Sequence, residues 1–202
     1  MKKNQQLRRM DVFSFQRAKG GQETCGDSFF FEETEDYFVC ALADGLGSGV
    51  DANKASHAAI SEIRSHHALE NIEQLFLRAN HAMKDKRGAV LTVFFVDYVK
   101  KELTCASIGN IRLFFHSATG KLTYPLPQSG YLSGRPQKLK IQTFPCEQGS
   151  TFLIHSDGLE LRSPRNVGWQ LKSTKSAFEQ LATSIEEKPT DDVTYLIGTF
   201  AR

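Results

Sequence analysis

Residues 38–50 read FVCALADGLGSGV and join an apolar run to one acidic residue and three glycines. The run 38–43 is typical of a buried strand, because it is short, continuous and followed by turn-forming residues. It ends on Asp44, and the glycines follow at alternate positions from 45 to 49. An Asp-Gly pair most often forms a tight turn, since glycine adopts positive φ without steric strain. The same letters also fit a phosphate-binding loop or the frame of a metal site, so three interpretations stay open at this point.

The composition indicates a globular protein with a hydrophobic core. The 202 residues are 40% hydrophobic and 24% charged, with 25 Lys and Arg against 23 Asp and Glu. Because these charges nearly balance, we do not expect nucleic acid as the main partner. The longest apolar run, 90–96, is far shorter than the ~20 residues that cross a bilayer, and no apolar segment follows the basic start. We therefore expect no membrane segment and no signal peptide, and a cytoplasmic protein that acts as a monomer.

The cysteines are predicted to be reduced. They contain no CxxC pair, and two of them lie inside apolar strand-like runs, where a cysteine behaves as a small hydrophobic residue. We therefore expect neither disulfides nor a thiolate zinc site among Cys25, Cys40, Cys105 and Cys146.

The pattern of apolar residues predicts an α+β fold of strands and a few helices. Helices are expected in 51–67, 71–84 and 176–185, where small and apolar residues recur at helical spacing. Strands are expected at 28–32, 37–43, 89–98, 102–109, 111–117, 151–156 and 193–200. The segment 124–138 contains Pro125, Pro127, Gly130 and Gly134, which break regular structure, and is predicted to be a long loop. No repeat or linker divides the chain, so we expect a single domain over residues 1–202.

Acidic residues recur at the ends of the predicted strands. Asp44 and Asp157 follow apolar runs, whereas Asp27 and the pair Asp191-Asp192 precede them. If these carboxylates converge, they repel one another and lose hydration, and bound divalent cations would relieve both penalties. An all-oxygen ligand set favours Mg²⁺ or Mn²⁺ over zinc. If they do not converge, each is an ordinary turn or cap residue, and the residues alone leave that alternative open.

The order of these motifs resembles that of the PP2C (PPM) superfamily of metal-dependent serine/threonine phosphatases. The motifs are Gly26-Asp27, Asp44-Gly45, Ser156-Asp157-Gly158 and Asp191-Asp192-Val193-Thr194. The stretches CGDSFF, IGNIRLFFHS and YPLPQSGYLSGRPQK further resemble the bacterial branch that includes the sporulation and stress-response phosphatases. This resemblance implies a central β-sandwich flanked by α-helices, in α-β-β-α layers.

The resemblance also implies a set of metal ligands. Asp44 would bridge two or more divalent cations, Mn²⁺ or Mg²⁺, with the Gly45 carbonyl as a further ligand. Asp157 and Asp191 would complete the second metal site, and Asp27 would be an outer carboxylate that acts through a water. The cations would activate a water for in-line attack on phosphorus, so the implied catalytic residues are Asp44, Asp157 and Asp191. Supporting roles are implied for Asp192 and Thr194.

Two positions depart from the eukaryotic branch of the superfamily. Leu46 stands where that branch has a histidine that can donate a proton. No arginine occurs in 20–27, where that branch has a phosphate-gripping arginine, and Arg17 lies farther upstream. The loop 124–138 is either an ordinary surface loop or a site that recognises a partner near its phosphoserine. In the second case the recognising side chains would be Tyr131, Arg135 or Lys138.

These observations favour a metal-dependent protein serine/threonine phosphatase. The resemblance implies that its substrates are phosphorylated STAS-domain proteins of the stressosome, of the RsbS and RsbR type. Their dephosphorylation would give negative feedback on the general-stress sigma factor, sigma-B. The alternative is a catalytically inactive PP2C-like module that only binds its partner, but all four acidic motifs are intact. A nucleotide-binding loop fits poorly, since Val50-Asp51 follow the last glycine where a phosphate-binding loop needs Lys and Ser or Thr.

Overall fold

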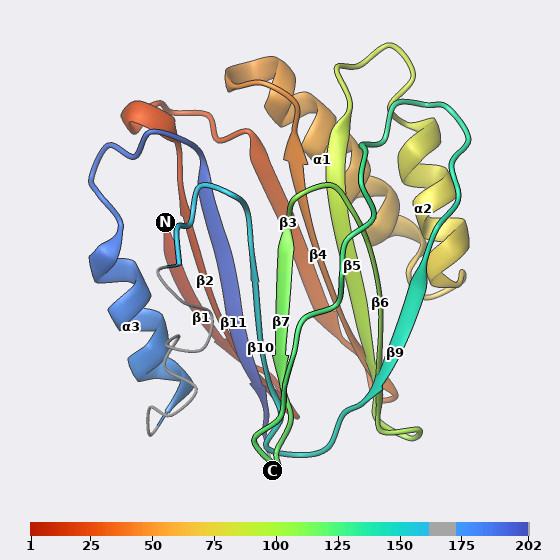
Figure 1. The fold of residues 1–202 in the computed structure, drawn as a ribbon, viewed down its shortest axis with the longest axis vertical. Helices are drawn as coiled ribbons and strands as arrows, with labels where there is room; N and C mark the ends of the chain where they lie inside the picture. Colours follow the sequence, from red (N-terminus) through yellow and green to blue (C-terminus); the bar gives the residue numbers. More distant parts are fainter. Residues whose placement is uncertain (162–172, 202) are drawn as a thin grey trace.

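The computed structural model describes residues 1–161 and 173–201 as two antiparallel β-sheets packed face to face between helices (Figure 1). In spatial order, the first sheet contains β1 (Lys2–Gln6), β2 (Met10–Arg17), β11 (Val193–Phe200), β10 (Thr151–His155), β7 (Arg112–His116) and β8 (Leu122–Thr123). The second contains β3 (Asp27–Glu33), β4 (Tyr37–Gly45), β5 (Ala89–Asp97), β6 (Glu102–Ile108) and β9 (Ile141–Pro145).

Helices cover the outer faces of both sheets. The second sheet carries α1 (Gly49–His66) and α2 (Ile72–His81), and the first carries α3 (Thr174–Ser184) (Figure 1). A short 3-10 helix, η1 (Lys19–Gly21), follows β2. The α-β-β-α layers confirm the fold class that the sequence predicted.

The strand β4 explains why the stretch 38–43 is apolar at every position. Its alternate side chains Phe38, Cys40 and Leu42 point into the core between the sheets. The intervening residues Val39, Ala41 and Ala43 belong to a second core beneath α1 and α2. The strand is therefore buried on both faces, and a strand buried in this way reads as a continuous apolar run.

Aromatic side chains join the two sheets across the central core. The ring centroids of Phe94 on β5 and Phe152 on β10 lie 4.9 Å apart, in an edge-to-face arrangement. The ring of Phe38 lies 5.8 Å from that of Phe152. Such aromatic pairs contribute about 0.5–1.5 kcal/mol beyond the area that they bury. The two sheets therefore form one packed unit, which keeps residues on opposite sheets at fixed separations.

Two of the helices, α2 and α3, begin at a residue whose side chain caps the first turn. The side chain of Asn71 accepts a hydrogen bond from the amide of Gln74 (3.0 Å) at the start of α2. Ser173 accepts one from the amide of Ser176 (3.2 Å) at the start of α3. These side-chain oxygens satisfy amides that lack a partner within the helix. All three predicted helices are confirmed, with boundaries shifted by one to three residues.

Several strands were not predicted. The strand β1 is polar and fully exposed, so it shows no apolar alternation, and it is held by its antiparallel pairing with β2. The short β8 and the edge strand β9 also lie outside the predicted set. The four cysteines are free thiols in this structure. Among the helices of residues 1–161 and 173–201, none has the length and apolar character needed to cross a membrane.

Candidate metal centre

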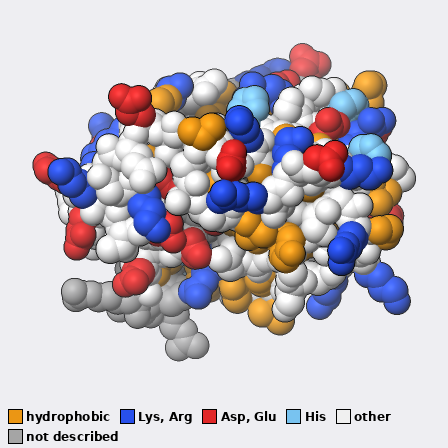
Figure 2. Space-filling view, turned by 90° about the horizontal axis from the view of Figure 1, so that it is seen from above, with side chains coloured by type: hydrophobic (Ala, Val, Ile, Leu, Met, Phe, Trp, Pro, Cys, Tyr) orange, Lys and Arg blue, Asp and Glu red, His pale blue; other side chains and the backbone are white. Residues whose placement is uncertain are grey.

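The four acidic motifs meet at one end of the sandwich, the upper end in Figure 1. Asp27 begins β3, Asp44 lies near the end of β4, and the two are direct cross-strand partners. Asp157 follows β10, and Asp191 lies just before β11, its antiparallel neighbour. Figure 2 looks onto this end and shows acidic and basic side chains close to one another on the surface. The structure therefore brings the predicted carboxylates of both sheets together.

Asp27 is the most deeply buried of these carboxylates. The residue is only 2% exposed, and neither of its carboxylate oxygens has a hydrogen-bond partner. Burial raises the pKa of this carboxyl well above its ordinary value, and the facing Asp44 raises it further. A buried carboxylate without partners is unstable unless it is protonated or faces a cation.

The surroundings of Asp44 and Asp157 also disfavour the ionised form of each carboxyl group. Burial raises the pKa of Asp44 to about 7, and the nearby carboxylates of Asp157 and Asp191 add to this shift. Burial, followed by repulsion from Asp191, also raises the pKa of Asp157. One oxygen of Asp157 accepts a hydrogen bond from the side-chain amide of Asn110 (2.7 Å). The site therefore concentrates acidic groups that repel one another when all are ionised.

Asp191 is partly exposed. Its carboxylate accepts a hydrogen bond from the amide of Asp192 (2.9 Å), and the Lys19 ammonium lies 3.8 Å away. Asp192 points inward and accepts hydrogen bonds from the amides of Lys19 and Gly26, both at 2.9 Å. It thus joins the start of β11 to the segment before β3. This contact links the two sheets beside the carboxylates.

The glycine after Asp44 has a packing role. A Cβ on Gly45 would lie 1.9 Å from the carbonyl oxygen of Ala52 in the first turn of α1. Gly45 is a strand residue without positive φ, so the structure does not support the tight turn at Asp44-Gly45, one of the three interpretations that the sequence left open. Positive φ values occur instead at Gly47 (98°) and Gly49 (72°), where the chain turns into the helix.

Polar residues that the sequence did not identify support the site. The side-chain amide of Gln16 donates to the carbonyl of Asp27 (3.1 Å) and to the hydroxyl of Thr194 (3.2 Å). Gln16 lies on β2, which was not predicted, so its position was hidden. Asn110 follows the glycine between two predicted strands, and a polar residue in such a turn is the signal that could have identified it.

The donor set fits a divalent cation that keeps part of its water shell. In residues 1–161 and 173–201, no three His, Cys, Asp or Glu side chains are arranged to hold an ion between them. Mg²⁺ commonly binds only one or two protein carboxylates and retains several waters, so a spread set of carboxylates suits it. The oxygens of Asp27 have no hydrogen-bond partner and lie opposite Asp44, so a cation bound at this end of the sandwich would stabilise both carboxylates.

The two departures from the eukaryotic pattern also have structural consequences. The amide of Leu46 donates to the carbonyl of Gly88 (3.0 Å), which extends the pairing of β4 and β5 beyond the strand end. The guanidinium of Arg17 donates to the carbonyls of Ile185 (3.1 Å) and Glu186. Arg17 is therefore engaged at the end of α3 and does not replace the missing phosphate-gripping arginine.

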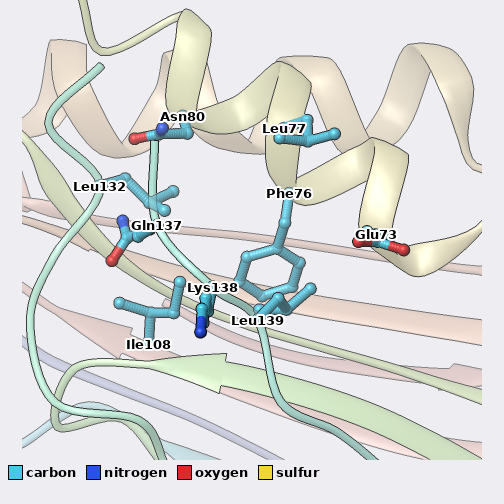
Figure 3. Close-up of a pocket in the computed structure, with 9 residues that line it drawn as sticks. All are labelled: Glu73, Phe76, Leu77, Asn80, Ile108, Leu132, Gln137, Lys138 and Leu139. Carbon is cyan, nitrogen blue, oxygen red and sulfur yellow. The ribbon is translucent and has the colours of Figure 1, made fainter. Parts of the chain in front are cut away.

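The loop 124–138 is tied to α2 by one side chain. The carbonyl oxygen of the Asn80 side chain accepts from the amides of Ser133 and Gly134, both at 3.0 Å. Its amide donates to the carbonyl of Arg135 (2.7 Å). A cavity of about 380 Å³ lies between this loop and α2 (Figure 3). It is lined by Glu73, Phe76, Leu77, Asn80, Ile108, Leu132, Gln137, Lys138 and Leu139.

The three side chains predicted to recognise a partner lie on different parts of this loop. Lys138 lines the cavity beside α2, and the carbonyl of Arg135 is held by Asn80. The ring of Tyr131 packs against Gly88, where a Cβ would lie only 2.8 Å from it. Of the three side chains, Tyr131 therefore lies next to Gly88, the residue whose carbonyl accepts a hydrogen bond from Leu46. Its role in recognition stays a prediction.

Comparison with known proteins places this chain in a family. The sequence profile described as Stage II sporulation protein E (SpoIIE) matches residues 34–202. The chain belongs to this family of PP2C-type phosphatases and is an enzyme of the protein-phosphatase class. It is 42% identical over 187 residues to the phosphoserine phosphatase RsbX of Bacillus subtilis (strain 168), covering 91% of this chain and 92% of that protein.

Solved structures agree with this assignment. A crystal structure of RsbX in complex with magnesium superimposes with a TM-score of 0.93 at 37% identity, covering 100% of both chains. A second structure, described under the bacterial stressosome, gives a TM-score of 0.83 at 29% identity and covers 94% of this chain and 98% of that chain. The resemblance inferred from the motifs and the predicted sandwich are both confirmed.

Proposed function

We propose that this protein removes phosphate from phosphoserine and phosphothreonine in STAS-domain proteins of the stressosome, of the RsbS and RsbR type. This dephosphorylation would give negative feedback on the sigma-B pathway. The proposal is supported by the 42% identity to the phosphoserine phosphatase RsbX and by the structural similarity to a chain described under the bacterial stressosome. We further propose that residues 1–202 form one domain that acts as a cytoplasmic monomer, without nucleic-acid or membrane partners.

We assign the metal ligands to Asp27, Asp44, Gly45, Asp157 and Asp191, with Asp44, Asp157 and Asp191 as the catalytic residues. The observation that carries this assignment is the buried Asp27 carboxylate, which has no hydrogen-bond partner and faces Asp44 across the strand pair. Mn²⁺ or Mg²⁺ bound here would supply positive charge for the phosphoryl oxygens and activate a water for attack on phosphorus.

The surrounding residues have positioning roles. Asn110 fixes one oxygen of Asp157 and so directs the other toward the site. Asp192 holds the amides of Lys19 and Gly26 and keeps the two sheets in register at this end. Leu46 has no group that can donate a proton, so we propose that the leaving serine oxygen takes its proton from water.

The test is phosphate release from a phosphoserine STAS-domain protein, measured with Mn²⁺ and with chelator. We expect release by the wild-type protein only with the metal, and a loss of at least about 100-fold in Asp157→Ala, since charge-stabilising groups of this kind contribute on this scale. The matched control is Asp36→Asn. It changes an aspartate in the turn between β3 and β4, at the end of this hairpin that is farthest from Asp27 and Asp44. Binding of the partner without any release would favour the inactive module instead.

A further inference from the structure

Arg87 lies beside the entrance of the acidic site. It precedes β5, and the residues after it pair with the end of β4, with Gly45 opposite Ala89. The backbone approach continues past the strands, because the amide of Leu46 donates to the carbonyl of Gly88 (3.0 Å). Arg87 is therefore next to the turn that follows Asp44, although the two are far apart in the sequence.

Gly47 provides the space that the Arg87 side chain occupies. A Cβ on Gly47 would lie 2.8 Å from a guanidinium nitrogen of Arg87, so a larger residue here would displace the guanidinium from its present position. Gly47 is three residues after Asp44, and three residues of chain extend over at most about 10 Å. The guanidinium thus lies beside the turn that follows Asp44, and its flexible side chain can turn toward a group that is bound there.

Arg87 forms a weak ion pair with Asp51. One guanidinium nitrogen lies 3.3 Å from the carboxylate of Asp51, and both side chains are more than half exposed. Exposed ion pairs of this kind contribute little to stability, about 0–1 kcal/mol. Lys54 lies 4.0 Å from the other oxygen of Asp51 and can neutralise it if Arg87 turns away. Arg87 can therefore exchange this carboxylate for a dianionic phosphate.

Three other basic residues lie near this end, and one of them, Arg112, lines a cavity together with Asp157. The guanidinium of Arg17 donates to carbonyls at the end of α3. The Lys19 ammonium lies beside Asp191, one of the proposed metal ligands. Arg87 differs from these three because its guanidinium lies against Gly47, in the turn that follows Asp44, and its one ion pair within the described residues is the exposed one with Asp51. A guanidinium can also grip two phosphate oxygens at once, whereas an ammonium is a point charge.

We propose that Arg87 binds the phosphate group of the substrate and supplies the cationic grip that the segment 20–27 lacks. This inference rests on the proposed phosphatase function and adds a substrate-binding residue to it. The role is binding, so Arg87 should affect KM and phosphate affinity more than kcat. Because the grip is on the phosphate itself, it should be felt by any phosphomonoester and by inorganic phosphate.

The experiment compares Arg87→Ala and Arg87→Lys with the wild type in Mn²⁺. KM and kcat are measured for p-nitrophenyl phosphate and for the phosphoserine STAS-domain protein, and the inhibition constant for inorganic phosphate. We expect Arg87→Ala to raise both KM values and the inhibition constant by about tenfold or more, as for the loss of a charged hydrogen bond. Arg87→Lys should be intermediate, because it keeps the charge but loses the second contact.

The matched control is Lys86→Ala, which removes a neighbouring charge whose ammonium donates instead to the carbonyl of Ala82 (2.9 Å). It should leave KM and the inhibition constant within about twofold of the wild type, because a surface charge away from the phosphate has little effect. An unchanged KM for p-nitrophenyl phosphate in Arg87→Ala would overturn the proposal. A rise confined to the protein substrate would also overturn it, because Arg87 would then contact the partner and not the phosphate.

The result can be separated from a failure of the proposed function. If the wild-type protein releases no phosphate with Mn²⁺, the phosphatase function fails and binding is measured in its place. Fluorescence anisotropy then compares the phosphorylated and unphosphorylated STAS-domain protein with wild type and Arg87→Ala. A preference for the phosphorylated form that disappears in Arg87→Ala supports the phosphate grip, and an equal preference in both proteins rejects it.

Discussion

Replacing Asp44 by Asn should stabilise the metal-free protein while destroying its response to metal. Burial and the neighbouring Asp157 and Asp191 raise the pKa of Asp44 from 3.8 to about 7. A shift of that size corresponds to about 4 kcal/mol against the ionised form in the folded chain. We take about 2 kcal/mol as the measurable effect, because local relaxation and entering water weaken repulsion between buried charges.

The sign of the effect depends on pH. Below pH 3.8 the carboxyl is protonated in the folded and the unfolded chain, so Asp44→Asn should have little effect. Between 3.8 and about 7 only the unfolded chain loses its proton, and the wild-type protein becomes progressively less stable as the pH rises. At pH 8 the variant should therefore unfold at a temperature about 4–8 °C higher than the wild type.

The assay is thermal and urea unfolding followed by circular dichroism at pH 4, 6 and 8, with chelator and then with saturating Mn²⁺. A ligand at 100 times its dissociation constant stabilises the folded state by about 2.7 kcal/mol, and this gain should be largely lost in Asp44→Asn. The control, Asp36→Asn, should respond to Mn²⁺ as the wild type does. A variant that is less stable than the wild type in chelator at pH 8, or that gains equally from Mn²⁺, would refute the reasoning.

Three further substitutions test the contacts around the site. Gly45→Ala should lower the free energy of unfolding in urea by about 2 kcal/mol or more, because its Cβ would lie 1.9 Å from the carbonyl of Ala52, and a loss below about 0.5 kcal/mol would contradict this packing. Asp192→Ala should lower it by about 1–3 kcal/mol and also weaken Mn²⁺ binding in calorimetry, because two buried amides lose their acceptor. Asn80→Ala should speed proteolysis and amide exchange in the loop 124–138, and unchanged protection would show that the three Asn80 hydrogen bonds do not hold it.

Most of the elements that were predicted are buried, although β2 was missed despite its buried residues. The continuous apolar run of β4 and the helical spacing in α1 identify elements whose side chains face a core, and these were located from the sequence. The strand β1 was missed because all of its residues are exposed, and it is held in place largely by main-chain pairing with β2. Main-chain pairing leaves no mark on the choice of side chains, so the pattern of apolar residues gave no signal for it.

The acidic residues of the site were identified from their positions at strand ends, but their convergence was not. The sequence shows that Asp27 and Asp44 each adjoin a strand, whereas their direct pairing depends on the register of β3 and β4. Arg87 gave no signal either, because its approach to Gly47 depends on chain pairing beyond the end of β4 and before the start of β5. Contacts that depend on strand register or on how two elements cross cannot be read from the local spacing of residues. The chemical type of the candidate ligands can be read from it.

The glycines beside the aspartates explain how repelling carboxylates can be kept together. A Cβ on Gly26 would lie 2.8 Å from the carboxylate of Asp192, and one on Gly158 would lie 2.2 Å from its carbonyl oxygen. Neither glycine has positive φ, and neither does Gly45, so the requirement at all three positions is close approach and not turn geometry. Asp27, Asp44 and Asp157 are thus each fixed through an adjacent glycine whose backbone is packed against another element. Because the packing holds the backbone, the ionised side chains have little freedom to move apart, so their repulsion is relieved by protonation or by a bound cation.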